Sequence, residues 1–232
     1  MASDTNNQGL QAAIAQALEL VPPHSVIGLG SGRAATAFVR ALGERVRQGL
    51  RVRGVPTSRA TADLAAQVGI PLTSLDLVEQ LDITVDGADE VDPQLNLIKG
   101  LGGALVREKI VAAASERFII IAGEEKWVPQ LGSRGVLPVE VVPFGIALCS
   151  KRLAALGCKP RPREMKGSLF VTDNHNNILD CQISALTDPV KLEQEMRAIP
   201  GVVGTGLFLG MAQTVLIYDD SSFRKLERSI PE

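Results

Sequence analysis

The sequence predicts an α/β fold with a parallel sheet in its main domain, followed by a small α+β domain. Up to about residue 131, short apolar runs alternate with amphipathic segments, and the apolar runs lack a polar–apolar alternation. Strands that are buried on both faces of a parallel sheet have this composition. Beyond Gly132 the order of the expected elements becomes β-α-β-β-α-β, which is typical of a ferredoxin-like domain.

Hydrophobic spacing and the positions of glycine and proline define the individual elements. In the main domain we expect helices over residues 10–21, 34–46, 59–68 and 103–115, and strands over 25–29, 52–55, 82–85 and 118–122, with 72–75 as a further candidate strand. In the small domain we expect strands over 136–142, 159–163, 168–172, 178–183 and 202–209, and helices over 145–156 and 190–199. The apolar run 213–218 is expected to return to the first sheet as a strand. The main domain is then discontinuous, with residues 1–131 and 207–232, and the small domain comprises residues 132–206.

Composition and charge argue against several classes of function. The chain has 232 residues, a formal net charge of −2 and 3% aromatic residues, and it contains no cluster of Lys and Arg. We therefore expect neither a nucleic-acid partner nor binding to an anionic membrane. The apolar runs are too short to span a membrane and the N-terminus lacks a signal-peptide pattern, which predicts a cytoplasmic protein. Three cysteines without C-x-x-C spacing and only two histidines predict no zinc site.

The stretch VIGLGSGRAATAF, Val26–Phe38, combines a short apolar run, closely spaced glycines and the start of a helical pattern. Backbone N–H groups at a helix N-terminus bind anions, and glycines allow the anion to approach them. A dinucleotide-binding loop would require an acidic residue at the end of the next strand, but that strand ends in RGVPTS. Ser31 and Arg33 add a hydroxyl and a guanidinium, which suit a phosphate group. A tight turn without a ligand is the alternative interpretation.

Two further segments bring polar residues to the same edge of the predicted sheet. The strand that ends at Asp86 continues into DGADE, and Lys99 precedes a glycine-rich turn into the next helix. Because ligands bind beyond the carboxyl ends of parallel strands, we expect these segments and residues 30–34 to share one rim. Clustered carboxylates such as Asp86 and Asp89 suit proton transfer, Mg²⁺ binding or a solvated turn, and the pattern alone does not separate these. Glu108 stands between two cationic residues of a predicted helix, which is typical of a surface position.

Several longer motifs follow one another along the chain: GLGSGRAA, VDGADE, IKGLGGALVREKI, LPVEVVPF, VTDNHNNILD and IPGVVGTGLF. In order and spacing, these motifs resemble those of the ribose-5-phosphate isomerases of type A, from the first helix to about Leu216. The resemblance implies a Rossmann-like main domain, a small ferredoxin-like domain, and a homodimer or homotetramer. It also implies interconversion of D-ribose 5-phosphate and D-ribulose 5-phosphate without a metal or cofactor, in the pentose phosphate pathway or in carbon fixation.

The same resemblance assigns roles to individual residues. It implies that Glu108 is the catalytic base, that Asp86 and Asp89 are the acidic residues of the active site, and that Lys99 is its lysine. The substrate-binding residues that it implies are Gly30, Ser31, Gly32, Arg33, Ala34, Gly100, Gly102, Gly103 and Lys126. In the expected reaction Glu108 moves a proton from C2 to C1 through a cis-enediolate, and Lys99 with nearby N–H groups stabilises the oxyanion.

The chain departs from the family pattern at the phosphate loop. Arg33 and Ala34 occupy positions where the family usually has hydroxyl side chains, and Leu101 interrupts a run of glycines. A lysine that the family commonly has near its N-terminus is also absent. We hypothesise that Arg33 replaces these groups as the phosphate ligand. The departures keep three alternatives open: a non-catalytic sugar-phosphate sensor, an isomerase for another phosphorylated sugar, and a nucleotide-dependent enzyme.

Overall fold

Residues 7–228 are described in the computed structural model, and their contacts divide them into two units. Unit 1 comprises residues 7–88, 107–127 and 211–228, and unit 2 comprises residues 89–106 and 128–210. Each unit encloses a hydrophobic core of its own. The domain bounds expected from the sequence remain a prediction.

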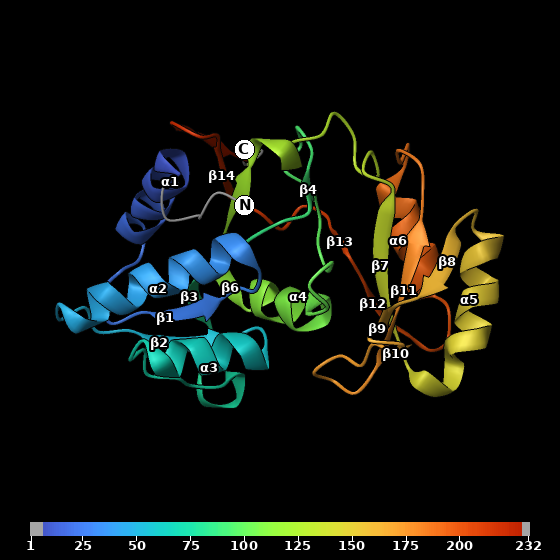
Figure 1. Cartoon of the computed structure of the whole chain (residues 1–232), viewed down its shortest axis with the longest axis horizontal. Helices are drawn as coiled ribbons and strands as arrows, with labels where there is room; N and C mark the ends of the chain where they lie inside the picture. Colours follow the sequence, from blue (N-terminus) through green and yellow to red (C-terminus); the bar gives the residue numbers. More distant parts are fainter. Residues whose placement is uncertain (1–6, 229–232) are drawn as a thin grey trace. The chain divides into compact units, whose positions relative to one another are not determined.

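Unit 1 is built on a six-stranded sheet with the strand order β15-β14-β6-β3-β1-β2 (Figure 1). Its strands are β1 Val26–Leu29, β2 Arg53–Pro56, β3 Leu81–Asp86, β6 Ser115–Gly123, β14 Thr214–Tyr218 and β15 Phe223–Glu227. All neighbouring pairs are parallel except β14 and β15, which are antiparallel. The loops that follow β1, β2, β3 and β6 therefore leave the sheet at the same edge, where ligands of such sheets bind.

Helices cover both faces of this sheet. They are α1 Gln8–Glu19, α2 Arg33–Arg47, α3 Arg59–Gln67 and α4 Leu105–Ala113. Phe38 of α2 packs in one core cluster with Ile27 of β1, whereas Val111 of α4 packs in another with Val26. Because neighbouring residues of a strand point to opposite faces, α2 and α4 cover opposite faces of the sheet.

Two expectations for unit 1 were wrong. The candidate strand over 72–75 is absent from the described structure, because Leu72 forms only an isolated bridge with Gly54 and Leu75–Leu77 form a 3₁₀ turn. Conversely, no strand was expected where β15 forms, because its residues FRKLE are mostly polar. Edge strands often carry charged side chains, which discourage pairing with a strand of another chain, so their composition does not distinguish them from loops.

Unit 2 contains a four-stranded antiparallel sheet with the strand order β12-β7-β11-β8. Along the chain its elements are β7 Val136–Val141, α5 Ile146–Ala155, β8 Lys159–Pro162, β11 Asn177–Gln182, α6 Pro189–Arg197 and β12 Val202–Thr205. This is the β-α-β-β-α-β order expected from the sequence. The shorter strands are β4 Glu90–Val91, β5 Leu97–Ile98, β9 Glu164–Met165, β10 Ser168–Leu169 and β13 Leu207–Phe208. Strands β13, β5 and β4 form a separate three-stranded sheet.

Two expected strands of unit 2 differ from the structure. Residues 168–172 do not join the four-stranded sheet, because β10 turns back on β9 in a short hairpin. Lys166 and Gly167 form its turn, with positive φ values of 53° and 79°. The expected strand over 202–209 is divided at Gly206 into β12 and β13, which belong to different sheets.

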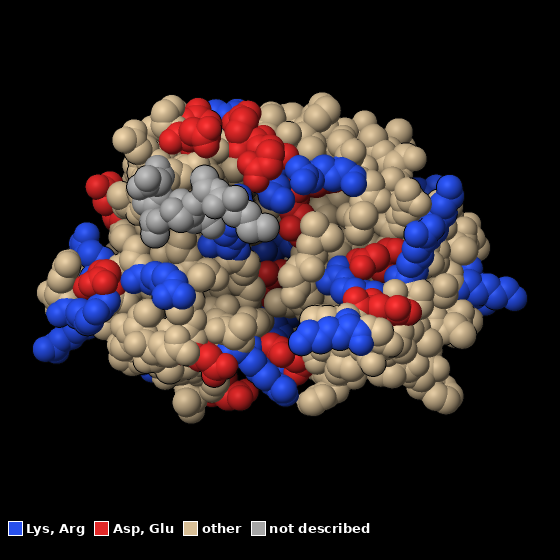
Figure 2. Space-filling view, in the orientation of Figure 1, with Lys and Arg blue, Asp and Glu red and all other residues tan. Residues whose placement is uncertain are grey.

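None of the helices within residues 7–228 has the length and apolar character needed to cross a membrane. On the face shown in Figure 2, the Lys and Arg side chains of the described residues are interspersed with Asp and Glu. This face therefore lacks an extended basic surface of the kind that binds nucleic acids.

Candidate active site

In unit 1, the loop after β1 is packed tightly against the end of β3. Gly30 donates its N–H to the carbonyl of Val85 at 3.0 Å, and the N–H of Ser31 donates to Oδ1 of Asp86 at 3.0 Å. A Cβ at Gly30 would lie 2.3 Å from that same carboxylate oxygen, so only glycine fits there. Gly32 has a φ of 97° and caps α2, which begins at Arg33. The structure thus brings the predicted phosphate loop and Asp86 together at the edge of the sheet.

Four hydroxyl groups meet beside this loop. Ser31 Oγ lies 2.8 Å from Thr57 Oγ1, 2.8 Å from Ser58 Oγ and 3.0 Å from Thr61 Oγ1. Thr57 donates to the carbonyl of Leu29 and Thr61 to the carbonyl of Gly30, each at 3.0 Å. Ser31 in turn donates to Ser58, and Ser58 donates to Thr61 at 2.9 Å, so the four hydroxyls form one network. A bound anion would have to draw the Ser31 and Ser58 protons out of these two bonds.

Apart from Ser31, this hydroxyl cluster was not among the residues expected at the site. Its signal is present in PTSRAT, which follows β2 directly and begins α3 with Ser58 as the N-cap. Since β2 is parallel to β1, its carboxyl end lies at the same edge as the glycine loop. Tracing each strand to its end, rather than searching for glycine motifs, would have identified these hydroxyls.

Arg33 projects from the first turn of α2 toward the segment after β6. Its Nη2 lies 3.5 Å from Oε1 of Glu125, and the two side chains are 60% and 52% exposed. An ion pair this exposed contributes little to stability, so a dianionic phosphate can compete with Glu125 for the guanidinium. Lys126, the next residue, is half-buried in the 3₁₀ turn Glu124–Lys126. Both predicted cationic ligands therefore lie at the ligand edge of unit 1.

Asp86 and Glu108 are the buried carboxylates of unit 1. Asp86 ends β3, is fully buried, and accepts the N–H of Gly87 at 2.7 Å as well as that of Ser31. Glu108 lies in the first turn of α4 and is only 5% exposed. The pattern of the sequence is typical of a surface glutamate, and the structure corrects this interpretation. A negative charge in the first turn of a helix is favoured by the helix dipole, which offsets part of the cost of burying it.

In unit 2, Asp89 is bonded to the loop that follows Lys99. Its N–H donates to the carbonyl of Ile98 at 2.8 Å, and its Oδ2 accepts the N–H of Leu101 at 2.9 Å. Gly103 N donates to the carbonyl of Gly100 at 3.0 Å, and both glycines have positive φ values of 87° and 108°. This glycine-rich turn is therefore closed by its own backbone and held to Asp89.

Lys99 is buried, with 2% of its surface exposed. Its backbone N–H donates to the carbonyl of Gly206 at 2.9 Å, and its ammonium lies 5.6 Å from the centre of the Phe208 ring. A cation over an aromatic face is stabilised electrostatically, more so where water is excluded. The structure therefore provides a fixed, desolvated cation rather than a mobile surface lysine.

The neighbouring acidic residues Glu90 and Asp92 have structural roles. Glu90 is buried and accepts the N–H groups of Gly132 at 2.6 Å and Arg134 at 2.7 Å. Burial raises the pKa of Glu90, and the bonds from Arg134 and Gly132 oppose the rise. Asp92 accepts the N–H of Asn96 at 2.8 Å and closes a tight turn.

The described residues contain no group of three or more His, Cys, Asp or Glu placed to hold a metal ion. Cys149, Cys158 and Cys181 are buried and free, within unit 2. Hydrogen bonding to Cys181 lowers the pKa of Cys158, whereas hydrogen bonding to Cys158 and burial raise that of Cys181.

Comparison with known proteins decides the family. The model of the family described as ribose 5-phosphate isomerase A (phosphoriboisomerase A) matches residues 53–222. The ribose-5-phosphate isomerase A of Bradyrhizobium diazoefficiens is 49% identical over 231 residues, covering 95% of each chain. That of Roseiflexus sp. (strain RS-1) is 53% identical over 210 residues, covering 89% of this chain and 90% of the relative. This chain belongs to the ribose 5-phosphate isomerase A family.

Solved structures of the family agree with this assignment. A D-ribose-5-phosphate isomerase in complex with phospho-erythronic acid superposes with a TM-score of 0.91 at 38% identity, covering 94% of this chain and 97% of that one. The ribose 5-phosphate isomerase from Plasmodium falciparum gives a TM-score of 0.91 at 35% identity, covering 95% and 98%. The predicted fold class and the predicted enzyme family are confirmed. The roles of the individual site residues remain predictions.

Proposed function

We propose that this chain interconverts D-ribose 5-phosphate and D-ribulose 5-phosphate through a cis-enediolate. The observation that carries the proposal is its family membership over almost its whole length, together with the presence of Asp86, Asp89, Lys99 and Glu108. The phospho-erythronic acid bound by a relative supports the enediolate, because its carboxylate can imitate the two oxygens of that intermediate. The remaining features in the proposal are the absence of a metal or cofactor requirement, a homodimer or homotetramer, and a cytoplasmic location.

We assign the proton transfer to Glu108. Its carboxylate removes the proton from C2 of the open-chain aldose and returns a proton to C1, while a proton moves between O1 and O2. A buried carboxylate suits this task because a nearby apolar environment excludes competing water. The negative charge that develops on the enediolate is stabilised by the ammonium of Lys99 and by N–H groups of the turn Gly100–Gly103.

Asp86 and Asp89 are assigned to the substrate's hydroxyl groups. The cyclic sugar must open before C2 can lose its proton, and a carboxylate that accepts a hydroxyl proton assists this opening. Asp86 has one oxygen engaged by two backbone N–H groups, and Asp89 has one oxygen engaged by Leu101. These bonds fix the orientation of both carboxylates, which is what positioned catalysis requires.

We assign the 5-phosphate to the loop Gly30–Ala34. Backbone N–H groups at the N-terminus of α2, the hydroxyls of Ser31 and Ser58, and the side chains of Arg33 and Lys126 supply its donors. Binding energy from this end of the substrate orients the distant C1 and C2 atoms, so it contributes to the chemical step as well as to affinity.

The test follows ribulose 5-phosphate formation from ribose 5-phosphate in the presence of a chelator. Wild type is expected to turn over, and Glu108→Gln is expected to lose at least about 100-fold in kcat, as is typical when a general base is removed. Glu116→Gln is the matched control, because Glu116 is exposed on β6 in the same unit. A folded Glu108→Gln variant with wild-type turnover would remove Glu108 from the mechanism.

The substitutions at Arg33 and Ala34 favour one alternative, an isomerase for another phosphorylated sugar. A panel of phosphorylated aldoses tests it, since a preferred substrate other than ribose 5-phosphate would show a higher kcat/KM. A non-catalytic sensor would instead bind sugar phosphates without turnover, and a nucleotide-dependent enzyme would gain thermal stability from NAD or NADP.

A further inference from the structure

Within unit 2, the guanidinium of Arg163 bonds the carboxylate of Asp180 on one side and two backbone carbonyls on the other. Arg163 follows β8 directly, and its side chain is only 12% exposed. Its Nε donates to Oδ2 of Asp180 at 2.8 Å, and its Nη2 donates to Oδ1 of the same carboxylate. Two parallel bonds between a guanidinium and a carboxylate fix the plane of the guanidinium. Asp180, on β11, therefore determines the direction of the remaining nitrogen.

The remaining nitrogen contacts the glycine-rich turn after Lys99. Nη1 of Arg163 donates to the carbonyl of Gly100 and to the carbonyl of Leu101, each at 3.0 Å. The guanidinium also lies 5.7 Å from the centre of the Phe170 ring. That ring fills the space beside Gly103, where an added Cβ would come within 2.5 Å of it. Arg163 and Phe170 thus contact the turn at Gly100, Leu101 and Gly103.

One peptide group connects Arg163 to Asp89. The carbonyl of the Gly100–Leu101 peptide accepts from Arg163, and the N–H of the same peptide donates to Asp89 Oδ2 at 2.9 Å. Because the peptide is planar and trans, fixing its carbonyl also fixes its N–H. A cation on the carbonyl polarises the peptide and strengthens the bond that its N–H donates. The chain of bonds therefore runs from Asp180 through Arg163 and one peptide to Asp89.

We propose that Arg163, oriented by Asp180, is a positioning residue that holds the Lys99–Gly103 turn and the carboxylate of Asp89 in their working geometry. The proposal rests on the function proposed above, in which Asp89 and this turn act on the substrate. Lysine cannot replace arginine in this role, because a single ammonium cannot bond both oxygens of Asp180 and two carbonyls in fixed directions.

The expected effect lies mainly on kcat. Misplacing a catalytic group by about 1 Å can cost about 100-fold in rate. We therefore expect Arg163→Lys and Arg163→Ala to lower kcat by about 10- to 100-fold. KM should change much less, because the phosphate ligands of the proposal belong to unit 1. Asp180→Asn should lower kcat in the same direction by a smaller factor, since it retains one acceptor oxygen for Arg163.

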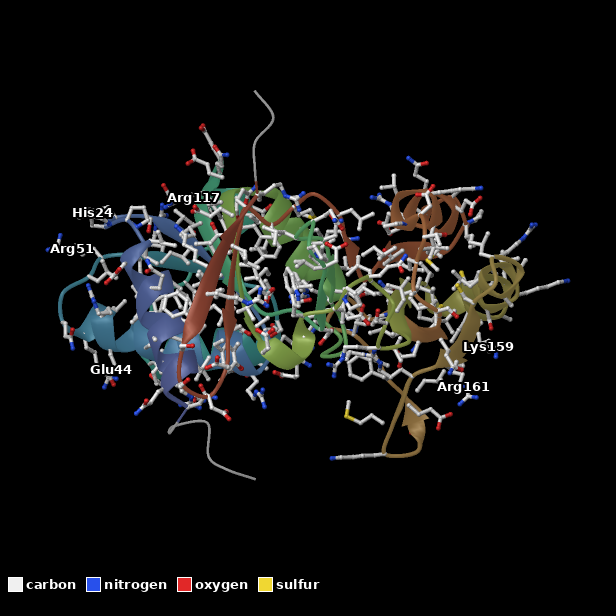
Figure 3. The ribbon with its side chains drawn as sticks, turned by 90° about the horizontal axis from the view of Figure 1, so that it is seen from above. His24, Glu44, Arg51, Arg117, Lys159 and Arg161 are labelled. Carbon is white, nitrogen blue, oxygen red and sulfur yellow. The ribbon has the colours of Figure 1, made fainter. Side chains whose placement is uncertain are left out.

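Arg161 supplies the matched control. It lies two residues earlier, on β8, and pairs in register with Asp180. Its side chain is exposed and extends away from the ribbon (Figure 3). Arg161→Ala and Arg161→Lys therefore remove the same chemical group two residues away, opposite the same Asp180, while the bonds to Gly100 and Leu101 stay in place. Both control variants should keep wild-type kcat and KM.

The experiment measures kcat, KM and melting temperature for wild type and all these variants. The activity assay is then repeated with millimolar guanidinium chloride, and with the same concentration of sodium chloride as the control. We expect guanidinium to restore part of the kcat of Arg163→Ala and to leave the kcat of wild type and Arg161→Ala unchanged.

A kcat within twofold of wild type for Arg163→Lys would overturn the proposal. So would a loss of kcat that matches the fraction of unfolded protein and that guanidinium does not rescue. If Arg163→Ala does not fold, Arg163→Lys and Asp180→Asn decide on the same criteria. Absence of turnover in the wild type would reject the proposed function itself.

Discussion

Replacing Gly206 by alanine should displace Lys99 while leaving the residues of the phosphate loop unchanged. Gly206 separates β12 from β13, and its carbonyl accepts the N–H of Lys99 at 2.9 Å. A Cβ at this position would lie 2.2 Å from the carbonyl oxygen of Lys99. Real Cβ atoms essentially never approach closer than 3.0 Å, so the two backbones must separate by the difference between 2.2 and 3.0 Å. The clash involves backbone on both sides, so no side-chain rotation relieves it.

This displacement defines the expected magnitude. A shift of almost an ångström at a positioned catalytic group is expected to lower kcat by up to about 100-fold. KM for ribose 5-phosphate should change much less, because the loop Gly30–Ala34 lies in unit 1 and Gly206 in unit 2. Overpacking of a well-packed site also destabilises the fold, typically by about 1–3 kcal/mol.

The assay follows ribulose 5-phosphate formation at saturating ribose 5-phosphate, with circular dichroism to determine the folded fraction at the assay temperature. Gly145→Ala is the matched control, because its Cβ would meet its nearest neighbours, Cys149 and Gly201, at an ordinary 3.7 Å. The control should keep its kcat. A folded Gly206→Ala enzyme that works at the wild-type rate would refute the reasoning, because it would show that the rate does not depend on the placement of Lys99.

Two other predictions concern the phosphate loop and a buried carboxylate. Arg33→Ala should raise KM for ribose 5-phosphate by about 10-fold, the lower end of the range for a hydrogen bond to a charged group, with little effect on kcat. Steady-state kinetics measure this, and an unchanged KM would show that Arg33 does not hold the phosphate. Glu90→Gln tests the raised pKa of Glu90. The raised pKa means that the folded protein binds the Glu90 proton more tightly than the unfolded protein does. Wild type should therefore gain unfolding free energy relative to Glu90→Gln as the pH falls from above the folded pKa toward 4.5. Denaturant melts between pH 4.5 and pH 8 measure the difference, and a flat or opposite trend would contradict the assignment.

The parts of the fold that could be predicted from the sequence are those with a strong local signal. Buried parallel strands are continuous apolar runs, so β1, β3 and β6 were expected close to their observed positions. Their carboxyl ends share an edge, so the expectation that residues 30–34 and Asp86 meet there required no further information. By contrast, β15 has the polar composition of a loop, and it becomes a strand only because β14 offers it a free edge. The edge strand also contacts the segment after β6, since its Arg224 donates to Glu124 and lies over the ring of Trp127.

Glu108 shows why local patterns mislead at buried charged positions. Two flanking cations are typical of a solvent-exposed glutamate, yet the side chain is 5% exposed. Burying a carboxylate costs free energy, and stable proteins do so mainly where the group has a chemical or structural use. The usual exposure of a glutamate between two cationic residues therefore does not predict the burial of Glu108. Only the wider resemblance, which spans many motifs, identified Glu108 as a candidate.

The groups to which we assign a positioning role are defined by tertiary contacts, so motif spacing alone did not identify them. Ser31 meets Thr57, Ser58 and Thr61 across two parallel strands, and only the shared edge of these strands, not the spacing of a motif, connects the two segments. Arg163 and Asp180 lie on opposite sides of a hairpin, and the carbonyls that Arg163 binds come from a turn some sixty residues earlier. Every residue has a backbone carbonyl, so the sequence does not indicate that Arg163 bonds the carbonyls of Gly100 and Leu101. Catalytic groups are visible in a sequence by their chemistry, whereas the groups that orient them are visible only by their distances.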